Sequence, residues 1–119
     1  MENNSNCIFC KIVAGQIPSN KIYEDDDILA FHDISPLRDI HALIIPKKHI
    51  ASLADTENSD AEVLGKMMAK IKDIAKLVGA DAGFRCIINT KEVGGQEVPH
   101  LHIHLISTKD GSCVGKMIG

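Results

Sequence analysis

The segment His100-Leu101-His102-Ile103-His104-Leu105-Ile106-Ser107 decides the fold, because histidine alternates with an apolar residue through its first five positions. A period of two predicts a β-strand, whose successive side chains point to opposite faces of a sheet. We expect the apolar residues to anchor this strand to the core and the histidines to line its other face. Each imidazole carries two nitrogens that need partners, so histidine is a costly packing residue. The segment therefore predicts a strand with a functional face.

Other strands are predicted before and after one long helix. Turn residues bound short strands at residues 21–24, 28–33, 41–45 and 83–90, and the histidine strand spans residues 100–107. Residues 8–14 suffice for one or two helical turns. Because the strands flank a single helix and several links have hairpin length, we expect an α+β fold with an antiparallel sheet.

The long helix is predicted between a capping box and a glycine. Ser59 and Glu62 have capping-box spacing, and Gly79 is a natural C-terminal stop. An apolar stripe is expected to face the core. Its members are Val63, Leu64, Met67, Met68, Ile71, Ile74, Ala75, Leu77 and Val78. In the strand at 83–90, Cys86 is expected to be a small core residue.

Length, charge and hydropathy restrict the class of protein. The 119 residues fit one domain, residues 1–119, with residues 1–6 as a frayed N-terminus and 107–119 as a C-terminal tail. The net charge of −3 gives no general attraction to nucleic acid or anionic membrane. The apolar runs are too short to span a bilayer, and the polar N-terminus has no export pattern. We therefore expect a cytoplasmic protein with reduced thiols and with neither nucleic acid nor membrane as a partner.

The spacing of the three histidines argues against one metal ion shared by all of them. Residues two apart on a strand are separated by roughly 6.5 Å, whereas zinc–nitrogen bonds are about 2.0–2.1 Å. Two neighbouring histidines with a ligand from elsewhere stay compatible with a metal. A neutral imidazole is also a good nucleophile near pH 7, and His102 has histidine neighbours on both sides. The residues alone favour attack on phosphorus by His102, with a structural or metal role as the alternative.

Five blocks of the sequence together resemble the histidine triad (HIT) family, in its nucleotide-binding branch. They are residues 7–12, 31–36, 41–50, 94–96 and the triad itself at 100–106. The chain resembles a purine nucleoside phosphoramidase of the zinc-binding subtype. The resemblance implies a HIT-like fold, with a five-stranded antiparallel sheet, one long helix and a short N-terminal helix. It also implies a homodimer whose two sheets join, with the long helices and the fourth strand near the contact.

The resemblance assigns a role to individual residues. It implies that His102 is the nucleophile, that His104 holds the phosphate and leaving group, and that His41 supports the triad. The implied reaction is hydrolysis of the P–N bond of purine nucleoside 5′-phosphoramidates through a nucleotidyl-histidine, with no cofactor required for catalysis. Nucleotide contacts are implied for Ile8, Phe9, Ile12, Phe31, His32, Ile34 and Leu43 at the base, for Asp33 at the ribose hydroxyls, for Asn89, Gly95 and Gln96 beside the ribose or phosphate, and for His102 and His104.

A structural zinc ion is implied by the same resemblance. Its ligands would be Cys7, Cys10, His49 and His100. Two thiolates and two imidazoles form a closed tetrahedral set, which is typical of structural zinc. Such a set removes His100 from the chemistry. Without zinc, the cysteines are ordinary thiols and His49 bonds a backbone carbonyl.

Several positions keep a plainer interpretation. Asp33 is also compatible with a cap on the turn before Pro36. His32 is compatible with a half-exposed strand residue, and Asn89 with a turn residue at the end of a strand. Lys47 and Lys48 suit a solvated turn and are not assigned to phosphate.

The leaving group stays open at this stage. Glu97 stands where some relatives carry a serine that contacts phosphate, and the tail differs from that of well-known members. The alternatives are a dinucleoside polyphosphate hydrolase using the same histidine, and a zinc-stabilised nucleotide-binding module with little turnover. A thiol oxidoreductase is a further alternative, but its C-x-x-C motif lacks the expected βαβ context.

Overall fold

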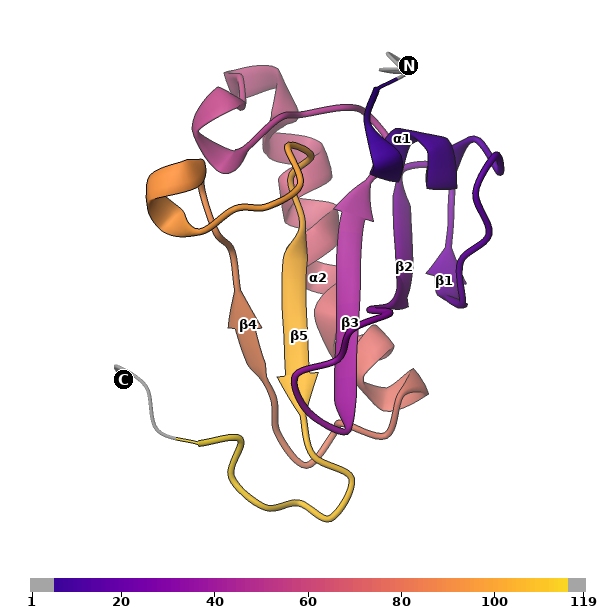
Figure 1. Ribbon diagram of the computed structural model, residues 1–119, viewed down its shortest axis with the longest axis vertical. Coiled ribbons are helices and arrows are strands. Elements are labelled where there is room, and N and C mark those ends of the chain that lie inside the picture. Colours follow the sequence, from indigo (N-terminus) through magenta and orange to yellow (C-terminus); the bar gives the residue numbers. More distant parts are fainter. Residues whose placement is uncertain (1–5, 116–119) are drawn as a thin grey trace.

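A computed structural model describes residues 6–115, and its elements follow the predicted order (Figure 1). They are α1 (Ile8–Val13), β1 (Lys21–Glu24), β2 (Ile28–His32), β3 (Ile40–Pro46), α2 (Ala61–Leu77), β4 (Arg85–Ile87) and β5 (Ile103–Ser107), with 3-10 turns at Leu53–Asp55, Asn58–Asp60 and Glu92–Gly94. Apart from Asn6, the N-terminus predicted to be frayed lies outside the described residues. The last four residues of the predicted tail also lie outside them.

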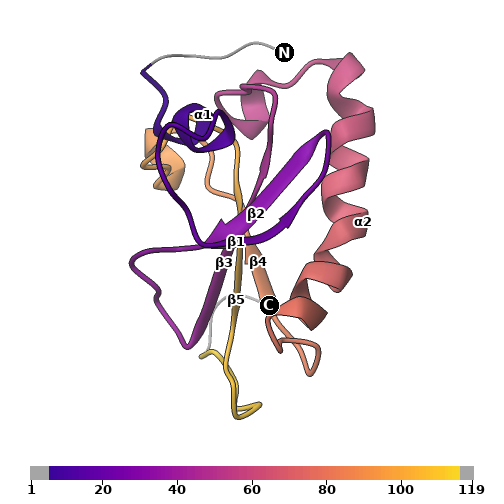
Figure 2. The same cartoon turned by 90° about the vertical axis from the view of Figure 1, so that its right-hand side faces the viewer.

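One antiparallel sheet organises the molecule. Its strand order is β1-β2-β3-β5-β4, and every neighbouring pair is antiparallel. Helix α2 covers one face of the sheet, against β1, β2 and β3, and the short α1 lies on the other side (Figure 2). The α+β fold with five antiparallel strands and one long helix is therefore as predicted.

Alternation along the strands divides the apolar residues between two cores. On the α2 side, Ala42 and Ile44 of β3 pack with Ile103 and Leu105 of β5. On the α1 side, Leu43 packs with other buried residues, among them Phe9, Leu29, Phe31 and Ile45. His104 is the register partner of Leu43 and so shares the α1 side of the sheet. The polar site is thus built on the face that α2 leaves uncovered.

Helix α2 buries a narrower stripe than the sequence predicts. Met67, Ile71 and Ile74 are buried, but Met68 and Leu77 are 61% and 62% exposed, so their predicted core positions are wrong. The helix touches the sheet along one face only, and both residues lie outside that face. No helix within residues 6–115 has the length and apolar character needed to cross a membrane.

The start of α2 also differs from the prediction. The predicted box of Ser59 and Glu62 is not used, because a 3-10 turn precedes the helix and Asp60 is its N-cap residue. The Asp60 carboxylate accepts a hydrogen bond from the Glu57 N–H at 2.8 Å and pairs with Lys48 at 2.6 Å. The capping contacts of Glu57 and Asp60 therefore lie two residues before the predicted pair.

Strand β4 is shorter and more exposed than predicted. It spans only Arg85–Ile87, and Cys86 is exposed and not in the core. Because β4 is an edge strand and α2 packs over β1 to β3, no helix covers Cys86. Phe84 and Ile88, on either side of β4, are also partly exposed.

Strand β5 begins at Ile103, so the prediction that His100 and His102 belong to this strand is wrong. The His100 N–H donates to the Val98 carbonyl at 2.8 Å, and the Leu101 N–H donates to the Ile50 carbonyl at 2.7 Å. These N–H groups are directed to loops instead of to a neighbouring strand. Pro99 has no N–H to contribute to a strand ladder.

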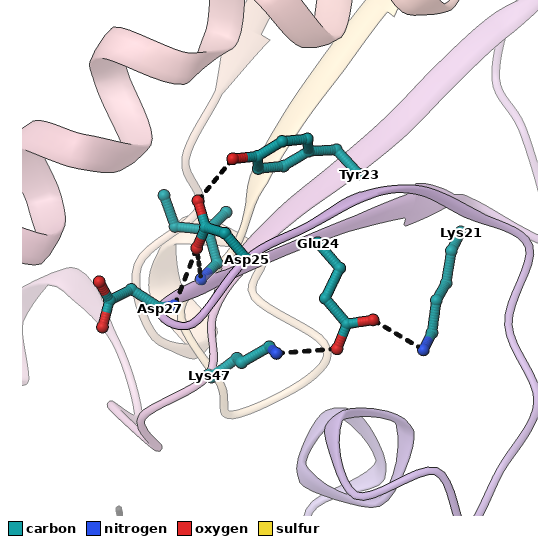
Figure 3. A network of polar contacts seen from close by, with 7 residues as sticks. Lys21, Tyr23, Glu24, Asp25, Asp27 and Lys47 are labelled. Carbon is teal, nitrogen blue, oxygen red and sulfur yellow. Dashed lines mark hydrogen bonds and ion pairs between the residues drawn. The ribbon is translucent and has the colours of Figure 1, made fainter.

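The acidic run between β1 and β2 forms a turn, as predicted (Figure 3). One oxygen of Asp25 accepts the N–H groups of Asp27 and Ile28, and its other oxygen accepts the Tyr23 hydroxyl at 2.7 Å. Lys47 pairs with Glu24 at 2.8 Å. Lys47 is thus engaged with a carboxylate of the fold.

Candidate functional site

Two cysteines and two histidines from three parts of the chain form the first polar cluster. Cys7 is the N-cap residue of α1 and Cys10 lies within that helix, whereas His49 follows β3 and His100 precedes β5. Cys7 Sγ and Cys10 Sγ lie 3.2 and 3.6 Å from His100 Nδ1. His49 Nδ1 lies 3.2 Å from Cys10 Sγ and 3.3 Å from His100 Nδ1. The four side chains thus direct one ligand atom each to a common point.

The donor set fits tetrahedral zinc. At Zn–N distances of about 2.0–2.1 Å and Zn–S of about 2.3 Å, tetrahedral ligand atoms stand roughly 3.3–3.8 Å apart. The other nitrogen of His100, Nε2, lies 2.8 Å from the Pro46 carbonyl and donates to it, which leaves Nδ1 as a lone pair. Burial lowers the pKa of His100 to about 4, so the ring is in its neutral, ligand form. Burial raises the pKa of Cys7, and a cation held there would stabilise the thiolate instead.

A second cluster combines Asp33, at the end of β2, with His41 of β3 and His104 of β5. His41 Nε2 lies 2.9 Å from His104 Nδ1 and 3.4 Å from Asp33 Oδ2. The Leu37 N–H donates to His41 Nδ1 at 3.1 Å. Because an N–H only donates, Nδ1 of His41 is an acceptor and its proton is on Nε2. That proton faces His104 Nδ1, so His104 carries its own proton on Nε2.

Burial keeps the two histidines of this cluster neutral. Burial, followed by the charges of His102 and His41, lowers the pKa of His104 to about 4. Burial also lowers the pKa of His41, although the Asp33 carboxylate opposes this effect. His104 is therefore a neutral ring at physiological pH, with an N–H to donate.

His102 lies between the two clusters and is buried. Its Nδ1 is 2.6 Å from the His100 carbonyl, which only accepts, so the proton of His102 is on Nδ1. In the neutral form of the ring, the lone pair is therefore on Nε2. The His102 ring centroid is 4.9 Å from that of His104, and Phe9 of α1 packs edge-on against His102 at 5.2 Å. The arrangement puts the Nε2 side of one imidazole beside a ring that has an N–H to donate.

The predicted base-contacting residues divide into two groups. Phe9, Phe31 and Leu43 are buried together on the face that carries the histidines, with Phe9 and Phe31 in edge contact at 5.5 Å. Ile12 is buried in the same core. In contrast, Ile34 is 97% exposed and Ile8 is 48% exposed, so the fold of one chain does not enclose them. His32, at the end of β2, is half-buried.

The remaining predicted residues lie in loops. Asp33 Oδ1 accepts a hydrogen bond from the Ser35 N–H at 2.8 Å, so Asp33 caps the turn. Its other oxygen, Oδ2, faces His41. Asn89 follows β4 and is half-buried, and Gly95 has a φ of 85° in the loop before the histidines. The Gln96 side chain bonds three backbone groups.

Sequence reasoning missed one functional contact, the Leu37 N–H on His41. A backbone amide has no sequence signature, so no motif indicates this donor. A hollow of about 250 Å³, lined by residues that include Arg85, Thr108 and Cys113, involves none of the histidines. Its lining residues lie at the start of β4, at the end of β5 and in the adjoining segments, and these parts lie at the opposite end of the sheet from α1 (Figure 1).

Comparison with known protein families matches residues 14–111 to the HIT domain. Protein HitA of Neisseria gonorrhoeae is 50% identical over 103 residues, which cover 87% of this chain and 96% of that protein. A 14 kDa zinc-binding protein of Brassica juncea is 44% identical over 101 residues, covering 83% of this chain and 89% of that protein. The family match includes His49 and His100, whereas Cys7 and Cys10 precede it.

Solved structures show the same architecture. A HIT family hydrolase from Legionella pneumophila Philadelphia 1 has a TM-score of 0.82 and 46% identity, covering 86% of this chain and 92% of that chain. A histidine triad protein from Clostridium difficile has a TM-score of 0.84 and 43% identity, covering 100% of this chain and 97% of that chain.

Proposed function

This chain belongs to the HIT domain family, and from that premise we propose that it hydrolyses the P–N bond of purine nucleoside 5′-phosphoramidates. The products are a nucleoside monophosphate and an amine. The observation that carries the proposal is the proton arrangement around His102. Its Nδ1 proton is held by the His100 carbonyl, and its Nε2 lone pair lies beside a neutral His104.

In the first step, the Nε2 lone pair of His102 attacks phosphorus and a P–N bond to the ring forms. The bond from phosphorus to the amine breaks, and the departing nitrogen keeps the electron pair and takes a proton from solvent. The His100 carbonyl, 2.6 Å from Nδ1, stabilises the positive charge that develops on the His102 ring. The His104 Nε2–H donates to a phosphate oxygen and stabilises the charge there.

In the second step, water attacks the phosphorus of the nucleotidyl-histidine. The P–Nε2 electron pair returns to His102, and the water loses one proton to solvent. This proton balances the one taken up in the first step. His41 takes no part in bond making, and its Nε2–H orients His104 through the 2.9 Å contact.

The nucleoside would bind on the α1 side of the sheet. Phe9, Phe31 and Leu43 offer an apolar surface for the base next to His102. Asp33 is the acceptor proposed for the ribose hydroxyls, using lone pairs beyond those on Ser35 and His41. Gly95 is the loop residue proposed beside the phosphate, because a glycine backbone can approach an anion closely.

We also propose that Cys7, Cys10, His49 and His100 hold a zinc ion. Support comes from the converging ligand atoms and from a relative named as a zinc-binding protein. When bound, the metal supplies a crosslink between α1, the segment after β3 and the segment before β5. The proposed reaction uses the side chains of His102, His104 and His41, which lie outside this set.

The decisive experiment is single-turnover trapping with adenosine 5′-phosphoramidate carrying a labelled phosphorus. The wild-type chain should form an acid-labile adduct on His102, and His102→Ala should form none and lose at least about 10³-fold in turnover. Lys72→Ala, on the exposed face of α2, is the matched control for handling. Wild-type turnover by His102→Ala would falsify the proposal.

Turnover of adenosine 5′-phosphoramidate and of diadenosine polyphosphates by the same protein separates the alternatives. A higher kcat/KM on diadenosine polyphosphates would make those the substrate, with the same nucleophile. Nucleotide binding without adduct or product would instead favour a binding module.

A homodimer through the edge of the sheet is proposed as well. Strand β4 is an unpaired edge among the described residues, and Phe84 and Ile88 beside it are 41% and 37% exposed. An exposed apolar sheet edge favours pairing with a second copy.

A further inference from the structure

Lys91 has a backbone conformation that is unusual for its residue type. Its φ is 61° and its ψ is 179°, and it is the only non-glycine residue with positive φ within residues 6–115. That region of the backbone map is occupied essentially by glycine, because a Cβ atom is strained there. Surrounding contacts must therefore hold Lys91 in place.

Three hydrogen bonds hold Lys91, and all come from its own loop. The Lys91 N–H donates to Gln96 Oε1 at 2.7 Å. The Lys91 carbonyl accepts the N–H groups of Gly94 at 3.1 Å and Gln96 at 3.0 Å. The loop is thus closed on itself, with the Gln96 amide oxygen as its one side-chain contact to Lys91.

The nitrogen of the same amide ties this loop to two other segments. Gln96 Nε2 donates to the Ala51 carbonyl at 2.7 Å and to the Val98 carbonyl at 2.9 Å. A side-chain amide has two N–H donors, so both donors of Gln96 are used. Gln96 therefore has no N–H left for a nucleotide phosphate.

These contacts continue to the nucleophile. The Val98 carbonyl that accepts from Gln96 also accepts the His100 N–H at 2.8 Å, and the His100 carbonyl accepts from His102 Nδ1. The chain between Gln96 and His102 is consequently fixed by a series of hydrogen bonds. A movement of Gln96 would therefore displace the His100 carbonyl, which orients the His102 ring.

We propose that Gln96 is a positioning residue, which imposes the strained conformation of Lys91 and fixes the segment that presents His102. This inference rests on the proposed phosphoramidase function. It assigns Gln96 to backbone contacts instead of a direct contact with the ribose or phosphate.

A double-mutant cycle tests the inference. Gln96→Met keeps the length of the side chain and removes its three bonds, and Lys91→Gly removes the strain that they oppose. We expect Gln96→Met to lower the single-turnover rate of adduct formation about 10- to 100-fold, while the Kd for adenosine monophosphate changes less than about threefold. Hydrogen exchange at the Leu101 and Lys91 amides should accelerate. In the Lys91→Gly background, the same substitution should destabilise the chain less.

The outcomes are distinct. If Gln96→Met weakens nucleotide binding as much as it lowers the rate and leaves amide exchange unchanged, Gln96 touches substrate and the inference is wrong. Additive stability effects would overturn the link to Lys91. If Gln96→Met does not fold, Gln96→Glu keeps an oxygen for the Lys91 N–H and loses both donors, so it tests the bonds to Ala51 and Val98 alone. This variant should slow adduct formation and accelerate exchange at the Leu101 amide, and unchanged values of both would overturn the inference.

Failure of the proposed function is recognised separately. Wild-type turnover by His102→Ala would rule out the proposed reaction. The amide exchange rates and the double-mutant stability cycle would still show whether Gln96 holds Lys91 in its strained conformation.

Discussion

The proton on each histidine of the site is assigned by a neighbour that can only donate or only accept. The Leu37 N–H assigns the proton of His41, and through it that of His104. The His100 carbonyl assigns the proton of His102. Two backbone groups therefore determine which ring offers a lone pair and which offers an N–H.

Neutral His104 makes the stability of the fold depend on pH. Burial lowers its pKa to about 4, whereas an imidazole in the unfolded chain titrates near 6.5. Between these values the unfolded chain binds a proton that the folded chain does not. The free energy of unfolding should therefore fall as the pH decreases through this window, by up to about 1.4 kcal/mol per pH unit from this ring.

Urea denaturation of the metal-free chain between pH 4 and 7 checks this prediction. His104→Asn should make the dependence of the unfolding free energy on pH shallower. An equally steep dependence in this variant would show that His104 is not the group responsible.

At the scale of elements, α1 connects the proposed metal centre to the proposed nucleophile, His102. The helix carries Cys10 and is capped by Cys7, and its Phe9 packs against His102. Six residues are too few to form a stable helix alone, so tertiary contacts must hold α1 in place.

Metal removal should therefore loosen the site as well as the fold. We expect chelation, or Cys10→Ser, to lower the Tm and to weaken adenosine monophosphate binding, because Phe9 loses its fixed position. Metal content and the Tm are the measurements, and Cys113→Ser, an exposed thiol outside the cluster, is the matched control. An unchanged Tm in the chelated chain, with the metal shown to be lost, would contradict the crosslink.

The elements show what the sequence can and cannot predict. β1 has its predicted bounds, β2 ends one residue earlier than predicted, and β3 is one residue longer at each end, because local alternation and turns define these strands. The start of β5 was not predictable, since it depends on the Ile50 carbonyl, far away in sequence. The bond from Gln96 to the Ala51 carbonyl depends on a distant segment in the same way. The contact of the Leu37 N–H with His41 is local, but a backbone amide has no sequence signature. The resemblance to the HIT family indicated the cluster of two cysteines and two histidines. That their ligand atoms meet at one point could be seen only in the folded structure.

At the scale of the whole molecule, the uncovered edge at β4 predicts association. Phe84→Asp should shift the chain toward a monomer in analytical ultracentrifugation, because a carboxylate would be buried in the joined sheet. Leu53→Asp, at an exposed position in a 3-10 turn, is the control and should leave the mass unchanged. A wild-type chain that sediments as a monomer at all concentrations would contradict the dimer.

The contact from His102 to the carbonyl of residue 100 has a consequence for how such chains diversify. Every amino acid supplies a carbonyl, so the partner of the nucleophile does not depend on the side chain at position 100. A chain in which apolar residues replace Cys7, Cys10, His49 and His100 is expected to keep the proposed reaction, provided that they hold the backbone at residue 100 in place. The proposed metal site and the proposed reaction therefore use different parts of residue 100, its side chain and its carbonyl.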